Sequence, residues 1–266
     1  MKTIFDIGGH SSTNKQILLL EIGADHIYYA LFDPVENRIS RMVHLECDES
    51  ELQDKVTALM KEYGSSEIFS CYVSSAFPQA LLLPFSAGKN HKEILHAVYD
   101  EPASALLKDD INEWQIQNVY LLPAGILESI TSVFPGATFC HAYTSTLKTY
   151  NGVNAEDQIA IHFTTKKFQV LVKKNGTLQL AQVYQYVSPL DVIYYLLKIC
   201  SELGLEQSKV YLIVSGLIEK DSALYKQLRD YFLHIVFFEP VAVKLPEHDL
   251  PVHFFTSLNN LAACAS

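Results

Sequence analysis

Between residues 157 and 238 the sequence carries strand and helix signals in an order that leaves few folds open. Three apolar, β-type stretches come first, namely DQIAIHF, KFQVLVKK and LQLAQVYQYV, and Asn175-Gly176 is typical of a tight hairpin turn. A helix follows, with Ser188 as its capping residue and Gly204 at its end. The strand KVYLIVSG, a helix over DSALYKQLRDYF and the strand HIVFFEP complete the segment. We therefore expect a β-β-β-α-β-α-β unit, a mixed sheet flanked by helices.

The first half of the chain repeats this order with one interruption. The stretches ILLLEI, HIYYALF and RISRMVHLE predict three strands, and Asp48 with Glu51 predicts a capping box at the start of a helix. VYLLPAG at residues 119–125 matches VYLIVSG at residues 210–216, an offset of 91 residues, whereas the first strands are offset by 141 residues. The halves agree if the first carries an insertion of 50 residues, roughly residues 65–114. Within it, EIFSCYVSS and QALLLPF predict strands and HKEILHAVYD a helix.

These patterns divide the chain into four parts. Residues 1–16 are mostly polar and lack a period, so we expect an N-terminal arm. Residues 17–155 are expected to form the first lobe, residues 156–249 the second lobe and residues 250–266 a closing helix. The apolar side chains of that helix that we expect to face inward are Phe254, Leu258, Leu261 and Ala262.

The stretch TIFDIGGHSS, at residues 3–12, looks like a phosphate-binding turn because an aspartate precedes two glycines and two serines. Such a turn needs a strand on each side. Only Met1 to Phe5 precede Asp6, which is too short for a buried strand, and no strand directly follows the serines. We therefore assign this stretch to the N-terminal arm, with Gly8 and Gly9 as flexible points.

Composition excludes several classes of function. Hydrophobic residues make up 49% of the chain and charged residues 19%, which supports a folded core. The net charge of −10 opposes binding to nucleic acid or an anionic membrane, since both need clustered Lys and Arg. The five cysteines lack zinc-site spacing and indicate free thiols in a reducing cytosol. No apolar run approaches the length of a membrane span, so we expect a cytoplasmic protein without membrane insertion.

Two β-β-β-α-β-α-β (ribonuclease H-like) lobes, an insertion in the first and a closing helix resemble the α/β plan of the actin-like ATPase fold, which actin, sugar kinases, heat-shock chaperones and bacterial pilus-assembly actins share. The chain is more closely similar to an uncharacterised bacterial family, known as a domain of unknown function with this fold. The similar stretches are LLLEIGADHIYYALFD, FPQALLLP, VYLLPAGILESI, FPGATFCHAYTSTL and HDLPVHFFTSLNNLAAC. The resemblance implies the fold and an internal duplication, but no particular chemistry, because one fold hosts many functions.

The resemblance also implies where a nucleotide would bind. In active members the first hairpin of each half carries a D-x-G pattern, in which the glycine admits a phosphate and the acid holds metal or orients water. Here the first hairpin has Glu21 and Gly23, so an acid and a glycine are present, but Ala24 and Asp25 replace the usual small polar pair.

The second and third elements depart further from that pattern. The second hairpin reads His162-Phe163-Thr164, without acid or glycine, and continues with Thr165 and Lys166. The third element, a Gly-Gly turn that holds adenosine in active members, has the single glycine Gly216 between Ser215 and Leu217, and Leu217 and Ile218 place bulk where the base would lie. These departures make ATP hydrolysis unexpected, although backbone donors or Lys166 and Lys167 could still hold an anion.

Other candidate sites have weaker patterns. His91 and His96 are five residues apart, whereas a zinc-binding H-E-x-x-H helix needs a spacing of four, so a solvated helix face is favoured. We expect His162, on an otherwise apolar strand, to be a hydrogen-bonded core histidine. Ser215 lacks the G-x-S-x-G pattern of a nucleophile elbow.

The sequence therefore favours a pseudo-ATPase, a protein without catalytic residues, metal or cofactor that acts as a binding or scaffold module. Its expected partner is a protein, engaged by the insertion or by the cleft between the lobes. The alternative is a nucleotide-binding or phosphotransfer protein with atypical phosphate loops. The degenerate nucleotide-site positions, which either hypothesis has to explain, are Glu21, Gly23, Thr164, Thr165, Lys166 and Gly216.

Overall fold

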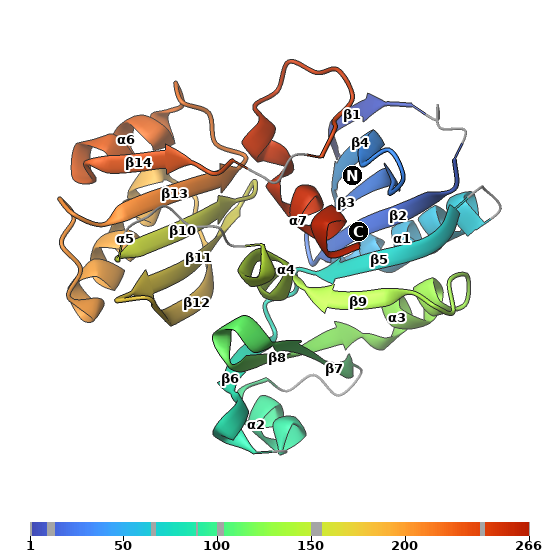
Figure 1. Cartoon of the computed structure of the whole chain (residues 1–266), viewed down its shortest axis with the longest axis horizontal. Helices are drawn as coiled ribbons and strands as arrows, with labels where there is room; N and C mark the ends of the chain where they lie inside the picture. The colour runs from blue at the N-terminus through green and yellow to red at the C-terminus, as the bar shows by residue number, and fades with distance from the viewer. Residues whose placement is uncertain are drawn as a thin grey trace. The chain divides into compact units, whose positions relative to one another are not determined.

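The computed structural model describes residues 2–9, 14–64, 68–88, 90–99, 104–149, 156–239 and 243–265. They form two compact units, each built from sheets and helices (Figure 1). Unit 1 consists of Met1–Thr149, Val241–Asp249 and Ser257–Ser266, and unit 2 consists of Tyr150–Pro240 and Leu250–Thr256. Within the described ranges, no helix combines the length and the apolar character that crossing a membrane requires.

Unit 2 contains a five-stranded sheet with helices on one face (Figure 1). The strand order is β12-β11-β10-β13-β14; β10, β11 and β12 are antiparallel neighbours, whereas β13 and β14 run parallel to β10. The elements are β10 (Gln158–Phe163), β11 (Lys167–Lys174), β12 (Thr177–Gln185), α5 (Pro189–Leu203), β13 (Tyr211–Gly216), α6 (Ala223–Tyr231) and β14 (His234–Phe237). Alternate strand residues, such as Ile159 and Val170, pack with Leu196 of α5 and Leu228 of α6 in one core.

Local sequence signals set the connections of unit 2 as expected. Asn175 and Gly176 both have positive φ angles, 50° and 78°, which is the backbone of a tight hairpin turn. The Asp191 carboxylate accepts a 2.7 Å hydrogen bond from the Ser188 amide at the start of α5. Gly204 ends α5 in the left-handed conformation. The predicted order of strands and helices in unit 2 is confirmed.

Unit 1 contains a six-stranded sheet in the order β1-β4-β3-β2-β5-β9. Its elements are β1 (Lys2–Gly8), β2 (Gln16–Gly23), β3 (His26–Asp33), β4 (Arg38–Glu46), α1 (Glu49–Gly64), β5 (Ile68–Ser75), α3 (Ala124–Thr131), β9 (Thr138–His141) and α4 (Ala142–Lys148). Leu18 and Leu20 of β2, Val56 of α1 and Ile130 of α3 share one buried core, so α1 and α3 cover the same face of the sheet. β5 and β9 run parallel to β2, and β3 and β4 complete an antiparallel meander.

The structural equivalence of the two halves differs from the expected one. The run β4-β3-β2-β5-β9 has the same order and directions as β12-β11-β10-β13-β14, so β5 corresponds to β13. VYLLPAG is expected to correspond to VYLIVSG, but its residues 119–123 lie in β8 (Ile116–Pro123) of a separate sheet, so the expected equivalence of the two stretches is wrong. Both stretches are short buried strands, and local sequence does not specify which sheet such a strand joins.

The extra sheet lies between β5 and α3 along the chain (Figure 1). Its strands pair in the order β6-β8-β7 and lie within residues 80–123, whereas the sequence predicts an insertion at roughly residues 65–114. Its elements are β6 (Ala80–Pro84), η1 (Phe85–Ala87), α2 (His91–Val98), β7 (Ser104–Ile111), η2 (Asn112–Trp114) and β8. The other expected boundaries, of the arm, the two lobes and the closing helix, stay predictions.

The expectation that the chain has no strand before Ile17 is wrong. β1 pairs antiparallel with β4 at the edge of the sheet, where a strand needs only one neighbour and one covered face. Phe5 is buried and its ring lies 5.5 Å from the rings of both Tyr28 and His44. Gly8 is not a flexible point, because it pairs with Arg41 at the end of β1. Its φ of 87° and the nearby Ser40 carbonyl leave no room for a side chain. Of TIFDIGGHSS, residues 10–12 lie outside the described residues.

The C-terminal segment is helical, as expected. It begins with the short helix η3 (Val252–Phe255) and continues as α7 (Thr256–Ala265). The four side chains expected to face inward are all buried: Phe254, Leu258, Leu261 and Ala262. Within unit 2, a 2.7 Å hydrogen bond between His253 Nε2 and the Ile218 carbonyl holds η3.

One carboxylate joins the extra sheet to the main sheet of unit 1. Asp109 of β7 accepts hydrogen bonds from the His141 amide at 2.8 Å, the Thr144 hydroxyl at 2.6 Å and the Tyr120 hydroxyl at 3.3 Å. Burial raises the pKa of Asp109, although these hydrogen bonds oppose the rise. The carboxylate thereby connects β7 and β8 to the end of β9 and the start of α4.

We expect Asp109→Ala to lower the free energy of unfolding by about 3 kcal/mol, because it leaves three donors without their acceptor. The matched control is Asp110→Ala, which removes an exposed carboxylate paired with Lys108 and should cost less than about 1 kcal/mol. Urea denaturation measures both values. Equal losses for the two variants would contradict the anchoring role of Asp109.

Candidate functional site

The first hairpin, where the sequence predicts the degenerate phosphate turn, lies between β2 and β3. Glu21 is buried on β2, and Gly23 pairs across the hairpin with His26 of β3. The imidazole of His26 lies directly over Gly23, so that a Cβ added to the glycine would lie 2.7 Å from the ring Nδ1. The space that a glycine opens for a phosphate is therefore filled by a side chain of the same hairpin.

His26 also forms ion pairs with both acids of this hairpin. Its Nε2 lies 3.4 Å from Glu21 Oε1, and its Nδ1 lies 3.0 Å from Asp25 Oδ1. Burial alone would lower the pKa of His26, but the hydrogen bonds and charges of Asp25 and Glu21 outweigh burial and raise that pKa to about 9. The imidazolium thus balances the charge of Glu21, the one acid of this chain that matches the metal-binding pattern of active members.

Polar side chains continue from Glu21 across the same face of the sheet. Tyr28 of β3 and Ser74 of β5 lie opposite Glu21 in the strand register. Burial, and next the charge of Glu21, raise the pKa of Tyr28 well above its ordinary value. The row extends to His44 of β4, whose ring stacks on Tyr28 at 5.0 Å. Glu21 is therefore held within a buried polar row rather than presented to solvent.

The second hairpin, between β10 and β11, is closed by its own hydrogen bonds. The Thr164 amide donates to the Lys167 carbonyl at 2.8 Å, and the Thr164 hydroxyl donates to the same carbonyl at 3.1 Å. The Tyr186 hydroxyl donates to the Thr164 carbonyl at 2.9 Å, and the Tyr186 amide donates to the Lys166 carbonyl at 3.0 Å. Thr165 and Lys166 are exposed at the tip of the turn.

The third element, the turn after β13, packs tightly against the end of β10. Gly216 has a φ of 76°, and a Cβ on it would collide with the Phe163 carbonyl and lie 2.8 Å from the Phe163 amide nitrogen. The Leu217 amide donates to that carbonyl at 2.8 Å. Ile218 is buried in the core of unit 2. This glycine serves close backbone packing within unit 2.

The predicted residues therefore fall into two groups. Glu21 and Gly23 lie together in unit 1, whereas Thr164, Thr165, Lys166 and Gly216 lie on adjacent turns of unit 2. His26 is the residue of this candidate site that sequence reasoning missed. The available signal was its position in EIGADHI, because a two-residue turn places it directly opposite Gly23.

The remaining sequence candidates lie outside these two groups. His162 is hydrogen-bonded through Nδ1 to the Ser215 hydroxyl at 3.0 Å, as expected for a structural histidine. Glu93 and His96 are exposed on α2. Within the part of the chain that the structure describes, no group of three His, Cys, Asp or Glu side chains is placed to hold a metal ion.

Gly216→Ala should lower the free energy of unfolding by at least about 2 kcal/mol, because the new Cβ meets the Phe163 backbone at a positive φ. Gly136→Ala is the control, since a Cβ there meets no atom within 4 Å, and its effect should stay below about 1 kcal/mol. Thermal and urea denaturation give both values. A neutral Gly216→Ala variant would show that this turn is open.

His26 should make stability depend on pH. Its pKa is raised from 6.5 to about 9 by folding, so its contribution is fully present below pH 6.5 and is lost as the pH rises through 9. The difference in unfolding free energy between wild type and His26→Gln should therefore fall by on the order of 3 kcal/mol between pH 6 and pH 10. His96→Gln, which removes an exposed histidine, is the control. Parallel pH curves for wild type and His26→Gln would contradict the ion pairs.

Comparisons with known proteins agree with the fold. A crystal structure from Bacteroides thetaiotaomicron, described as a protein with actin-like ATPase fold and unknown function, is similar with a TM-score of 0.76 and 14% identity over 94% of this chain and 96% of that chain. The PilM-PilN type IV pilus biogenesis complex contains a chain similar with a TM-score of 0.56 and 14% identity, over 93% of this chain and 98% of that chain. No curated protein matches.

These likenesses establish the actin-like ATPase fold of the chain, as the order of its elements predicts. The family described as "Protein of unknown function (DUF3822)" matches residues 9–235. The chain belongs to this family of unknown function with an actin-like ATPase fold.

Proposed function

We propose that this protein is a non-catalytic member of the actin-like fold that acts as a binding or scaffold module. The observation that carries the proposal is the position of His26, whose ring covers Gly23 and pairs with Glu21. A phosphate oxygen needs the space over the glycine, and a divalent cation needs the carboxylate. The His26 side chain fills the space over Gly23 and is the ion-pair partner of the Glu21 carboxylate.

The hairpins of unit 2 support the same proposal. Phosphoryl transfer depends on positioned phosphates and on metal ions that neutralise developing charge. The second hairpin has no acid, and the Thr164 amide and hydroxyl donate to a backbone carbonyl of the hairpin. The residues of this chain therefore do not fit bound Mg-ATP, and we propose neither a nucleotide cofactor nor a catalytic residue.

A protein is the partner that we propose. The similar chain of the PilM-PilN type IV pilus biogenesis complex comes from a protein that assembles with another protein, and this likeness at 14% identity supports the fold alone. The net charge of −10 disfavours nucleic acid. The described cysteines are all free thiols, which fits the reducing cytoplasm that we propose as its location. The repeated strand order supports descent of the two units from one duplicated ancestor.

A nucleotide-binding or phosphotransfer role is the second candidate, favoured by one observation. Thr165 and Lys166 are exposed at the tip of the second hairpin, where an ammonium group could hold a phosphate. Under this alternative His26 would have to leave Gly23 when the ligand binds.

A Mg-ATP titration by calorimetry and thermal shift distinguishes the two roles. We expect no binding heat and no change in melting temperature at millimolar ATP. A nucleotide present at about 100 times its dissociation constant would instead add about 2.7 kcal/mol of stability. Stabilisation that Lys166→Ala abolishes would overturn the non-catalytic proposal and support the alternative, with exposed Lys220→Ala as the matched control.

A further inference from the structure

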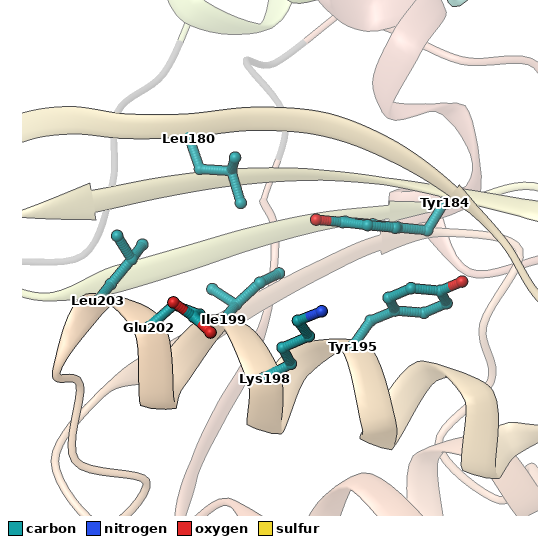
Figure 2. A pocket seen from close by; sticks show the side chains of 7 residues that line it. All are labelled: Leu180, Tyr184, Tyr195, Lys198, Ile199, Glu202 and Leu203. Carbon is teal, nitrogen blue, oxygen red and sulfur yellow. The ribbon is translucent and has the colours of Figure 1, made fainter.

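A pocket lies between β12 and α5 in unit 2 (Figure 2). Its volume is about 240 Å³. Leu180 and Tyr184 line it from β12, and three residues spaced four apart, Tyr195, Ile199 and Leu203, line it from α5. The rings of Tyr184 and Tyr195 stack at 4.3 Å and form one end of it. The interior is therefore apolar, which is the usual lining of a small-molecule site.

The register of β12 gives a physical reason for this pocket. Leu178 and Leu180 pair with consecutive residues of β11, so Gln179 bulges out of the ladder. Beyond the bulge, Leu180, Gln182 and Tyr184 alternate onto the face of the sheet that α5 covers. Leu180 and Tyr184 pack against the core of unit 2, whereas Gln182 is exposed. A polar side chain that turns to solvent thus occupies the middle position of the strand, and space remains between its two apolar neighbours.

Two exposed side chains of opposite charge, Lys198 and Glu202, complete the lining of the pocket. They are four residues apart on α5 and are therefore neighbours on the helix surface. Within the part of the chain that the structure describes, neither side chain forms a hydrogen bond or an ion pair. Figure 2 shows Lys198 reaching from α5 toward β12, and the Tyr184 hydroxyl directed along β12 toward Leu180. The exposed side of the pocket thus offers an ammonium, a hydroxyl and a carboxylate beside an apolar interior.

We propose that this pocket binds a small free α-amino acid with an apolar side chain, such as leucine. The Lys198 ammonium and the Tyr184 hydroxyl donate hydrogen bonds to the carboxylate of the amino acid, and Glu202 accepts one from its ammonium group. The side chain of the amino acid is buried against the aliphatic lining of the pocket. A ligand with a single charge would cover either Lys198 or Glu202 without pairing it, whereas a zwitterion pairs both.

Titration of the full chain with matched probes, followed through the ring signals of Tyr184 and Tyr195 by nuclear magnetic resonance, tests the proposal. We expect leucine to shift these signals with a dissociation constant of about 1 mM, as suits a ligand of so few atoms. 4-Methylpentanoate lacks only the ammonium group and isopentylamine lacks only the carboxylate, so each should bind at least about fivefold more weakly. Glycine, which lacks the side chain, should leave the signals unchanged. Ring signals that do not move at about 10 mM leucine, or equal binding of the first three probes, would overturn the proposal.

Two variants of exposed residues assign the charges without changing the core. Lys198→Gln should weaken leucine binding at least about fivefold and leave isopentylamine binding unchanged, because that probe has no carboxylate. Glu202→Gln should weaken leucine binding to a similar extent and leave 4-methylpentanoate binding unchanged. The control is Lys209→Gln, which removes an exposed lysine outside the pocket. Leucine binding that survives both variants would refute the proposed site. Nucleotide plays no part in these measurements, so their outcome is independent of the proposed function.

Discussion

The placement of His26 over Gly23 is the interaction on which the account of this protein depends. The glycine admits the ring, the ring pairs with Glu21 and Asp25, and the three groups form a closed charge cluster within one hairpin. A buried carboxylate is costly unless it is paired, and here the partner of Glu21 is the His26 side chain. The hairpin is thus present, and the space beside its glycine is filled by the His26 ring.

Much of the fold follows from local sequence. The hairpin at Asn175-Gly176 and the start of α5 at Ser188 have defined backbone requirements, and these elements lie where the sequence predicts them. The pairing of strands does not follow in the same way. VYLLPAG has the pattern of a buried strand, yet β8 joins the small extra sheet, because pairing depends on distant partners. The sequence pattern does not predict β1, because an edge strand needs few apolar residues, and Phe5 alone of its residues is buried.

The candidate site shows a similar limit. The resemblance to the actin-like fold identifies Glu21, Gly23 and Gly216 as positions of the nucleotide-binding motifs, because each motif has a fixed place along the chain. It does not reveal what fills the space around them. His26 is three residues beyond Gly23 in sequence and has the pattern of any strand residue. Only the cross-strand register, set by the two-residue turn, turns its ring toward the glycine.

The most direct measurement of the central claim is the titration of the His26 ring nitrogens by nuclear magnetic resonance, with and without Mg-ATP. The account predicts a pKa near 9 and no change of the ring signals on addition of nucleotide. A pKa near the ordinary histidine value of 6.5 would contradict the ion pairs with Glu21 and Asp25. Displacement of the ring signals by Mg-ATP would contradict a closed site.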